Sequence, residues 1–276
     1  MGTSFEIGSD TPMGESGKIV VVTGASSGIG AALARRLGAR GYGLTLCARR
    51  QNALDGVAGD AGQNTLTVRV DVTNRLDVER LRDAALDRFG RIDVWINNAG
   101  RGIVRPVLDL TDEDVDDMIA VNLKSALYGM QAVVPHFMSR SRGHVITVSS
   151  FLSRVPTATF RSIYSAAKAA LNILAANLRM DLAPRYPDIH VSTILPSIVI
   201  TDFARHALGA EPTAGVPNPP PGPIRRQTAE EIAEIILGVI DHPVAEVYTQ
   251  PALVEIARRY FDNVEAFEAA AAARQS

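Results

Sequence analysis

Tyr164 and Lys168 are the two residues whose types and spacing most directly suggest chemistry. They lie four positions apart in the segment Tyr-Ser-Ala-Ala-Lys, and residues at i and i+4 share one face of a helix. A free phenol has a pKa near ~10, and a neighbouring positive charge favours the phenolate. The pair therefore predicts a proton donor and acceptor that works closer to neutral pH than a free tyrosine. Because the same spacing occurs on solvated helix faces, its meaning depends on what accompanies it.

A glycine-rich segment near the start of the chain has the pattern of a phosphate-binding loop. An apolar run ends at Val22, three glycines follow as Gly-x-x-x-Gly-x-Gly, and a helical pattern begins at Ala31. Glycines let the backbone approach a diphosphate closely, and a helix N-terminus presents unpaired N–H groups. A glycine-rich tight turn without a ligand is the alternative. The residues predicted to contact the diphosphate are Gly24, Ser26, Ser27, Gly28, Ile29 and Gly30.

Two more motifs accompany these segments in a fixed order along the chain. Asn97-Asn98-Ala99-Gly100 lies midway, and Ser149-Ser150 lies shortly before the tyrosine. Together with the glycine-rich segment and the Tyr-Lys pair, they resemble the short-chain dehydrogenase/reductase family over about residues 18–202. The resemblance implies hydride transfer by a nicotinamide cofactor, which performs the difficult chemistry while the protein positions it.

The resemblance also implies the catalytic residues. Tyr164 would be the general acid in reduction and the general base in oxidation. Lys168 would lower the tyrosine pKa and bind the nicotinamide ribose, and Ser150 would donate a hydrogen bond to the substrate oxygen. Asn122 would hold a water chain leading from Lys168. Ser150 lies 14 residues before Tyr164, one more than is usual in the family, so the intervening segment is expected to bulge, with Ser149 as the fallback.

The end of the second predicted strand favours NADP(H). Sites that bind an unphosphorylated ribose usually place an acidic residue there, but this chain has Arg49 and Arg50. A guanidinium binds phosphate through several charge-assisted hydrogen bonds, whereas a carboxylate would repel it. The arginines are therefore predicted to bind the 2′-phosphate, the alternative being that they only solvate a loop.

Further cofactor contacts follow from the resemblance. For Asp71 and Thr73 a helix N-cap role is nearly as well supported, and for Asn97 a role in stabilising the sheet stays open. Ser197 stands where many relatives have glycine. The other residues implied to contact the cofactor are Asp71, Val72, Asn98, Ala99, Gly100, Tyr164, Lys168, Pro196, Ile198, Val199 and Thr201.

Short β-branched runs alternate with helical patterns throughout the chain, which is typical of parallel βαβ units. The runs lie at 19–22, 44–47, 66–70, 94–96, 144–148 and 190–194, with a last one at 246–249. Near-continuous apolar strands indicate a sheet covered by helices on both faces. The predicted fold is α/β, a Rossmann-like doubly wound parallel sheet in a single domain over residues 18–276.

Three segments fall outside this alternation. Residues 1–17 are expected to be a flexible tail, and the proline-rich segment 204–226 is expected to be a substrate loop or lid. A capping-box pattern of Thr228 and Glu231 starts the next predicted helix. Residues 251–276 are predicted to form a C-terminal helix with an apolar stripe.

Composition excludes several classes of function. The chain has 276 residues, with 28 Lys and Arg against 30 Asp and Glu and a formal charge of −2. This offers no broad basic field for nucleic acid or an anionic membrane, and no run approaches the roughly 18 apolar residues of a membrane-spanning helix. Residues 1–17 lack the features of a secretory signal, so the protein is expected to be cytoplasmic. Cys47 is the single cysteine; it is predicted to be buried and inert, and no metal site is predicted.

The function predicted from these observations is NADP(H)-dependent reduction of a ketone or oxidation of a secondary alcohol. Nearby apolar residues suggest a lipophilic substrate; they are Phe151, Leu152, Val155, Ile198 and Phe203. Reduction of a 3-oxoacyl thioester is the second prediction, with a basic surface for an acidic carrier formed by Arg101, Arg105, Arg154 and Arg161. A non-catalytic NADP(H)-binding scaffold or regulator is the third. By resemblance, a homodimer or homotetramer is expected.

Overall fold

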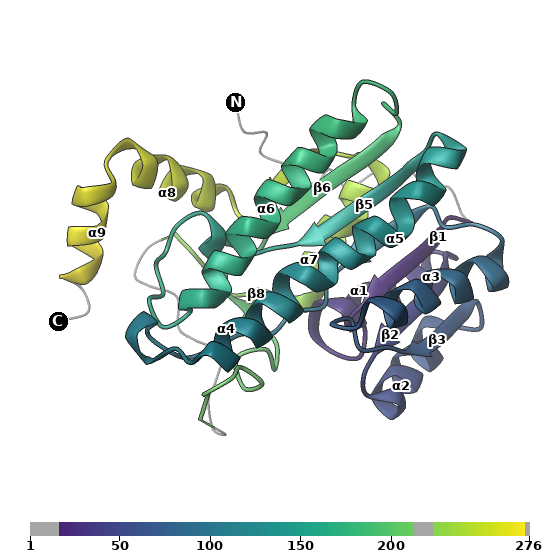
Figure 1. Cartoon of the computed structure of the whole chain (residues 1–276), viewed down its shortest axis with the longest axis horizontal. Helices are drawn as coiled ribbons and strands as arrows, with labels where there is room; N and C mark the ends of the chain where they lie inside the picture. Colours follow the sequence, from purple (N-terminus) through teal and green to yellow (C-terminus); the bar gives the residue numbers. More distant parts are fainter. Residues whose placement is uncertain (1–16, 212–222, 274–276) are drawn as a thin grey trace.

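The computed structural model describes residues 17–211 and 223–273 of the chain. Its centre is a seven-stranded sheet in the order β3–β2–β1–β4–β5–β6–β9, and each strand runs parallel to its neighbours (Figure 1). The strands are β1 (Ile19–Thr23), β2 (Gly43–Ala48), β3 (Thr65–Arg69), β4 (Val94–Asn97), β5 (Gly143–Val148), β6 (Ile189–Leu195) and β9 (Glu246–Tyr248). The predicted alternation of strands and helices is confirmed.

Helices cover both faces of the sheet. One apolar cluster packs α1 (Gly28–Ala39), α2 (Gln51–Ala61) and α7 (Ala229–Asp241) against one face. A second cluster packs α3 (Arg75–Phe89), α5 (Ser125–Arg140) and α6 (Ser162–Leu182) against the other. The doubly wound Rossmann-like architecture is therefore confirmed, and it explains why the strands are apolar on both sides.

The order of strands reverses between β1 and β4, which places a crevice at their carboxyl ends. From β1 the chain moves outward to β2 and β3, then returns to β4 on the other side of β1. In sheets of this kind, ligands bind at such a switch point. The short helix α4 (Asp112–Ile119) and a π-helical turn, η2 (Ala120–Lys124), lead into α5 near this crevice.

The segments flanking the sheet differ partly from expectation. The capping box is present at the start of α7, where Thr228 Oγ1 accepts from Glu231 N at 3.1 Å and the Glu231 carboxylate accepts from Thr228 N at 2.7 Å. The predicted single C-terminal helix is wrong: α8 (Pro251–Asp262) and α9 (Val264–Ala272) are separated at Asn263. The Asn263 side chain accepts from Ala266 N at 2.9 Å and caps α9, so its own capping chemistry restarts the helix.

Other expectations concern parts of the chain that are described only in part. Residues 1–16 of the predicted tail and residues 212–222 of the predicted lid lie outside the described residues. Cys47 is fully buried in β2, and burial raises the pKa of its thiol to about 12, as expected for an inert cysteine. Among the helices that the structure describes, none has both the length and the apolar character needed to cross a membrane.

Candidate active site

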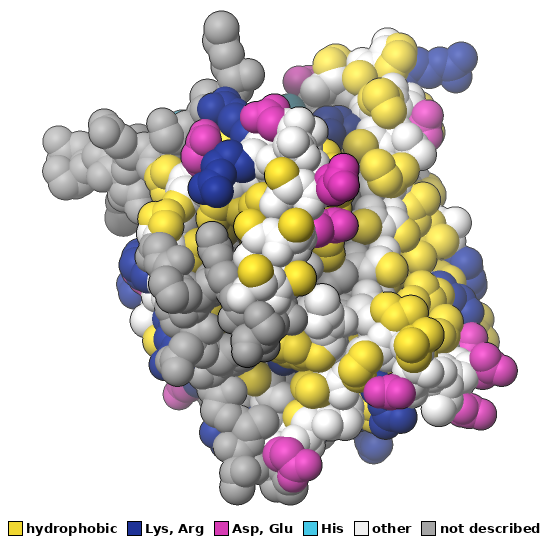
Figure 2. Space-filling model, turned by 90° about the vertical axis from the view of Figure 1, so that its left-hand side faces the viewer, with side chains coloured by type: hydrophobic (Ala, Val, Ile, Leu, Met, Phe, Trp, Pro, Cys, Tyr) yellow, Lys and Arg dark blue, Asp and Glu magenta, His cyan; other side chains and the backbone are white. Residues whose placement is uncertain are grey.

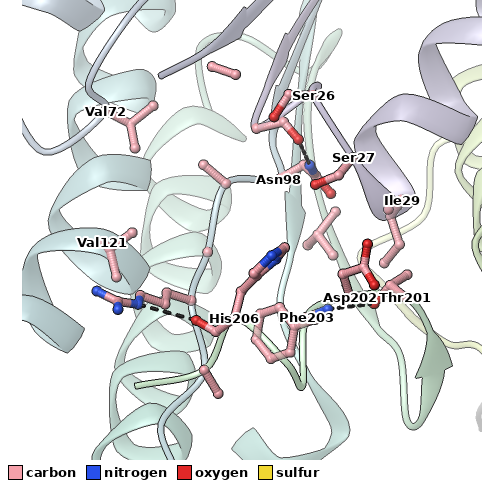
Figure 3. Close-up of a pocket in the computed structure, with 18 of the residues that line it drawn as sticks. Ser26, Ser27, Ile29, Val72, Asn98, Val121, Thr201, Asp202, Phe203 and His206 are labelled. Carbon is pink, nitrogen blue, oxygen red and sulfur yellow. Dashed lines mark hydrogen bonds between the residues drawn. The ribbon is translucent and has the colours of Figure 1, made fainter. Parts of the chain in front are cut away.

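A cavity of about 790 Å³ opens at the carboxyl ends of the central strands (Figure 3). Its size is typical of a small-molecule or cofactor site. The predicted residues that line it are Gly24, Ser26, Ser27, Gly28, Ile29, Arg49, Arg50, Asp71, Val72, Asn98, Ala99, Gly100, Ser150, Tyr164, Lys168, Pro196, Val199 and Thr201. The fold therefore gathers residues from seven separate segments into one space.

Three predicted residues are not among those that line this cavity: Gly30, Ile198 and Asn122. A Cβ at Gly30 would lie 2.5 Å from Gly24 O, so this glycine lets α1 pack closely against the loop. Ile198 instead accepts a backbone hydrogen bond from Gln227 N at 2.9 Å. Their contribution to a bound cofactor would therefore be indirect.

The glycine loop is tied to the end of β4. Gly24 has a φ of 67°, and a Cβ there would lie 2.8 Å from Ala99 Cα, so only glycine fits both the turn and the close approach. Thr23 Oγ1 accepts from the backbone N–H groups of Asn98 and Ala99, and Asn98 Nδ2 donates to Thr23 O at 2.9 Å. Ser27, the N-cap residue of α1, makes no side-chain cap hydrogen bond. Ser27, Gly28 and Ile29 at the N-terminus of α1 line the cavity, and a helix N-terminus attracts anions.

Arg50 is the arginine that reaches the glycine loop. Its Nη2 atom donates to Ser26 Oγ at 3.3 Å and to Ser27 Oγ at 3.2 Å. Arg49 also lines the cavity, and both arginines are exposed. The structure distinguishes them, because one bridges to the loop that would hold the phosphates.

Asp71 lines the cavity at the end of β3, but its carboxylate is used within a turn. Its Oδ1 atom accepts from the backbone N–H and the hydroxyl of Thr73, at 3.0 and 2.7 Å. The N-cap of α3 is Asn74, whose side chain accepts from Leu76 N at 3.0 Å. The alternative of an N-cap role for Asp71 or Thr73 is therefore wrong.

Tyr164 and Lys168 lie on the buried face of α6, as their spacing predicted. Lys168 Nζ donates to Val148 O at 2.9 Å and lies 6.0 Å from the centroid of the Tyr164 ring. The Ser150 hydroxyl forms a hydrogen bond with Tyr164. Ser149 Oγ instead donates to Lys168 O at 3.4 Å. The fallback is thus not needed: Ser150 is the serine paired with the tyrosine.

Comparison with known proteins identifies the family. A family model described as short chain dehydrogenase matches residues 18–211. An uncharacterized oxidoreductase from Staphylococcus epidermidis is 35% identical over 184 residues, which cover 67% of this chain and 79% of that protein. The chain belongs to the short-chain dehydrogenase/reductase family. It is therefore an oxidoreductase of a family that binds NAD(H) or NADP(H).

Other relatives of this short-chain dehydrogenase/reductase include a further sequence match and two solved structures of similar fold. An uncharacterized oxidoreductase from Listeria innocua is 32% identical over 233 residues, covering 82% of this chain and 91% of that protein. A short-chain dehydrogenase/reductase from Burkholderia phymatum, solved with NAD, has a TM-score of 0.80 and 25% identity, covering 91% of this chain and 95% of its own. An alcohol dehydrogenase from Thermococcus sibiricus, solved with 5-hydroxy-NADP, has a TM-score of 0.71 and 27% identity, covering 84% and 96%. Similar structures thus hold both kinds of cofactor.

The pKa of the tyrosine in this dehydrogenase/reductase differs from the sequence prediction. Burial raises the pKa of Tyr164 above its usual value, and the hydrogen bond from Ser150 and the positive charge of Arg161 only partly oppose this. Burial also lowers the pKa of Lys168 to about 8. Desolvation, which a helical spacing does not reveal, therefore outweighs the neighbouring charge.

The longer Ser150–Tyr164 segment is absorbed by a short helical turn. A 3₁₀ turn, η3 (Phe151–Ser153), follows Ser150 directly. Ser153 Oγ donates to Ser150 O, and Asn172 Nδ2 on α6 donates to Ser153 Oγ at 2.6 Å. The expected bulge is thus a turn anchored to α6, which holds the serine at the end of β5.

Asn122 lies in the π-helical turn η2 and fixes the loop after β4. Its Oδ1 atom accepts from Arg101 N at 3.1 Å, and its Nδ2 atom donates to Arg101 O at 2.9 Å. A Cβ at Gly100 would lie 3.0 Å from Asn122 Oδ1 and 3.5 Å from Lys168 Nζ. The glycine therefore allows the amide and the ammonium to converge over the same backbone. π-Helical turns often occur at functional sites.

The substrate end of the cavity includes residues that the sequence reasoning missed. Asp117, Val121, Arg205 and His206 line it, and Figure 3 shows His206 and Phe203 opposite Ser26 and Ser27 of the glycine loop. The signal that could have found Arg205 and His206 was their place a few residues after Thr201, at the carboxyl end of the sheet. No comparable signal marks Asp117, which lies about one helical turn before the Asn122 motif.

The apolar residues expected at the site are mostly elsewhere. Of the five, only Phe203 lines the cavity. Phe151 and Val155 pack with Leu253 and Ala257 of α8 in a separate cluster. The lipophilic character expected of the substrate therefore loses most of its support.

Proposed function

We propose that this short-chain dehydrogenase/reductase uses NADP(H) to interconvert a ketone and a secondary alcohol. The observation that carries the proposal is the convergence of Ser150, Tyr164 and Lys168 on one wall of the cavity that also contains the glycine loop. The cofactor supplies or accepts the hydride when bound. The protein supplies the proton and the orientation.

The proposed roles follow from these contacts. Tyr164 exchanges a proton with the substrate oxygen, and Ser150, already hydrogen-bonded to the tyrosine, donates to the same oxygen as it becomes negative. Lys168, now bonded to Val148 O, would turn to the ribose of the cofactor and hold a positive charge beside the tyrosine. Asn122 keeps the loop after β4 in place for this exchange.

NADP(H) is proposed because the β2 end carries guanidinium groups where an acid would bind the unphosphorylated ribose. Arg50 is seated on Ser26 and Ser27, where a 2′-phosphate could replace the serine hydroxyls as its partner. The test is parallel fluorescence titration of the chain with NADPH and NADH. We expect tighter binding of NADPH, and a loss of about tenfold for NADPH but not for NADH in Arg49→Ala and Arg50→Ala. Equal losses for the two cofactors would remove the phosphate role.

The substrate wall supports a carbonyl compound that carries a polar group. Phe203 and Val121 are apolar, while Asp117, Arg205 and His206 are polar or charged. The test of the reaction is oxidation of NADPH with a panel of ketones, using Tyr164→Phe as the matched control. Absence of turnover with every ketone, despite tight cofactor binding, would favour the non-catalytic scaffold.

The 3-oxoacyl thioester alternative is less well supported. Its predicted basic surface was formed by four arginines. Arg101 pairs with Asp117, Arg105 pairs with Asp114, Arg154 pairs with Glu246, and Arg161 is buried. An acidic carrier would therefore meet ion pairs in place of unpaired cations.

A homo-oligomer is proposed to form through the α6 side of the molecule. Ile173 and Met180 on α6 are 58% and 63% exposed. Figure 2 shows hydrophobic side chains gathered along its right-hand edge, which corresponds to the front of Figure 1, where α5 and α6 lie. Analytical ultracentrifugation tests this proposal: Ile173→Glu with Met180→Glu is expected to shift the assembly toward the monomer.

A further inference from the structure

Arg161 is a buried cation directly before the helix that carries the catalytic tyrosine. It is the N-cap residue of α6, three positions before Tyr164, and only 7% of it is exposed. Arginine is almost never fully buried unless it is paired, because desolvating its charge is costly. A buried guanidinium beside an active site therefore requires an explanation.

No carboxylate compensates this charge within the part of the chain that the structure describes. Arg161 Nη1 donates to the backbone oxygen of Ile103 at 3.0 Å, and none of the ion pairs involves Arg161. Two acids of α4 are already paired: Asp117 with Arg101 at 3.1 Å and Asp114 with Arg105 at 3.2 Å. The positive charge of Arg161 is thus left to act on its surroundings.

Two aromatic rings lie beside the guanidinium. Its central carbon lies 5.4 Å from the centroid of the Phe160 ring and 6.0 Å from that of Phe203. Phe203 in turn packs edge-on against Tyr164, with ring centroids 5.7 Å apart. Arg161, Phe203 and Tyr164 therefore form one continuous stack, in which the cation and the phenol are both buried.

Electrostatics couple the two ends of this stack. Burial lowers the pKa of Arg161, while the charge of Tyr164 raises it. Conversely, Arg161 acts to lower the pKa of Tyr164 against the effect of burial. Because a guanidinium stays protonated in proteins, its field at the phenol persists at every working pH.

The other charged groups around Tyr164 leave the local field positive. Lys168 lies on α6 itself. From α4 comes Asp117, which is paired with Arg101. The loop after β7 (Val199–Ile200) contributes His206 and Asp202, and Asp202 pairs with Arg205 at 3.2 Å.

We propose that Arg161 is a positioning residue that supplies a second positive charge to Tyr164 and holds Phe203 against it. The inference rests on the proposed function of Tyr164 as the proton-exchanging group. It assigns part of the tyrosine's activation to a residue outside the cavity wall. A purely structural Arg161 would anchor Ile103 and Phe203 without changing the proton affinity of the phenol.

The test measures the phenolate of Tyr164 directly. Ultraviolet difference titration of the full chain against its Tyr164→Phe variant isolates this tyrosine, with and without oxidised nicotinamide cofactor. Arg161→Gln is expected to raise the pKa of Tyr164 by about one unit, since an opposite charge nearby typically shifts a pKa by 1–3 units. In alcohol oxidation, the pH profile of kcat/KM should move upward by the same amount. Arg161→Lys should restore both readouts.

A second pair of variants avoids the buried position. Phe160 is 39% exposed and lies beside the guanidinium, so Phe160→Glu places a carboxylate against Arg161, while Phe160→Gln is its uncharged control. Only the glutamate variant is expected to raise the pKa of Tyr164. Arg142→Gln, an exposed change at the amino end of β5, controls for net charge and should leave the titration unchanged.

The outcomes distinguish a failure of the role proposed for Arg161 from a failure of the function proposed for Tyr164. If the phenolate titration is the same in the parent, Arg161→Gln and Phe160→Glu, the role of Arg161 is overturned. If Arg161→Gln does not fold, the Phe160 pair decides alone. If Tyr164→Phe keeps its turnover, the proposed function fails, while the titration still decides whether Arg161 acts on the phenol.

Discussion

The two ends of the central strands treat buried polar groups in opposite ways. At the amino end, Asp93 accepts from Ile19 N and Arg91 Nε at 2.9 Å and from Arg140 Nη2 at 3.0 Å. At the carboxyl end, Lys168 and Arg161 are buried with backbone oxygens as their hydrogen-bond partners. Among the described residues, the partly buried Asp93 thus has opposite charges as partners, whereas the buried Lys168 and Arg161 have backbone oxygens.

The difference indicates what each end contributes. Removing one member of a buried, fully paired set of charges costs stability, because its partners are left without their counter-charge. A buried charge without an opposite charge is unfavourable for stability, and such groups concentrate where chemistry requires a shifted pKa. Substitutions at the two ends should therefore affect different measurements.

The largest effect is expected at Tyr164. Tyr164→Phe removes the proton-exchanging hydroxyl and should lower turnover by ~10²- to 10⁴-fold, because the ring still fills the same space. The melting temperature and the affinity for cofactor should stay close to those of the parent chain. Steady-state kinetics on an active ketone and thermal unfolding measure the two. Undiminished turnover would remove Tyr164 from the mechanism.

The next largest effect is a dependence of the stability on pH, caused by His144 near the amino end of β5. His144 is buried, and its Nε2 atom lies 2.8 Å from Ser192 Oγ, which donates to Val244 O. Burial, helped by charges on His190 and Lys18, lowers the pKa of His144 to about 3. The unfolded histidine has a pKa near ~6.5, so the folded state binds this proton less tightly. The stability should be complete above pH ~6.5 and fall as the pH approaches 3, by about 3 kcal/mol at pH 4.

Urea unfolding at pH 7 and pH 4 checks this prediction. His144→Gln is the matched variant, because it cannot take up the proton. It should start less stable at pH 7 but lose about 3 kcal/mol less on acidification. If both chains lose the same amount, the histidine is not the acid-sensitive group.

A smaller effect is expected at Asp93. Burial raises the pKa of its carboxyl group, but hydrogen bonds from Ile19 N, Arg91 and Arg140 outweigh this and hold the pKa below its usual value. Asp93→Asn should cost about 2 kcal/mol of unfolding free energy, because it leaves the partners of the carboxylate without their counter-charge. Cofactor binding and turnover should be unchanged, since Asp93 is at the far end of the sheet. A loss of NADPH affinity equal to that of Arg50→Ala would contradict the division between the two ends.

The smallest effect is expected at Ser153, whose hydrogen bonds contribute both to the stability of the fold and to the position of Ser150. Ser153→Ala removes the link between the Asn172 amide and Ser150 O. About 1 kcal/mol of stability should be lost, since the two hydrogen bonds that are removed are only partly buried. Turnover should fall by a few-fold through loosening of Ser150. Calorimetry and kcat measure the two; Ser153→Thr, which keeps the hydroxyl, should retain both.

Local patterns in the sequence predicted the frame of the molecule. The apolar runs located seven strands of the sheet, the Thr228 capping box marked the start of α7, and the glycine spacing located the loop between β1 and α1. These signals succeed because each depends on residues within a few positions of one another. The spacing of Tyr164 and Lys168 likewise predicted their common face.

Tertiary structure decided what depends on burial and on distant partners. It placed Phe151 and Val155 in a cluster with α8 instead of the cavity, and it raised the pKa of Tyr164 where the spacing suggested the reverse. Among the described residues, it also left Arg161 without a carboxylate partner, because Asp117 and Asp114 pair with other arginines. The sequence by itself determined which chemical groups are available and on which elements they lie. Desolvation and charge pairing depend on segments that meet only in the folded chain. The tertiary structure therefore decided the pKa values and the ion pairs of those groups.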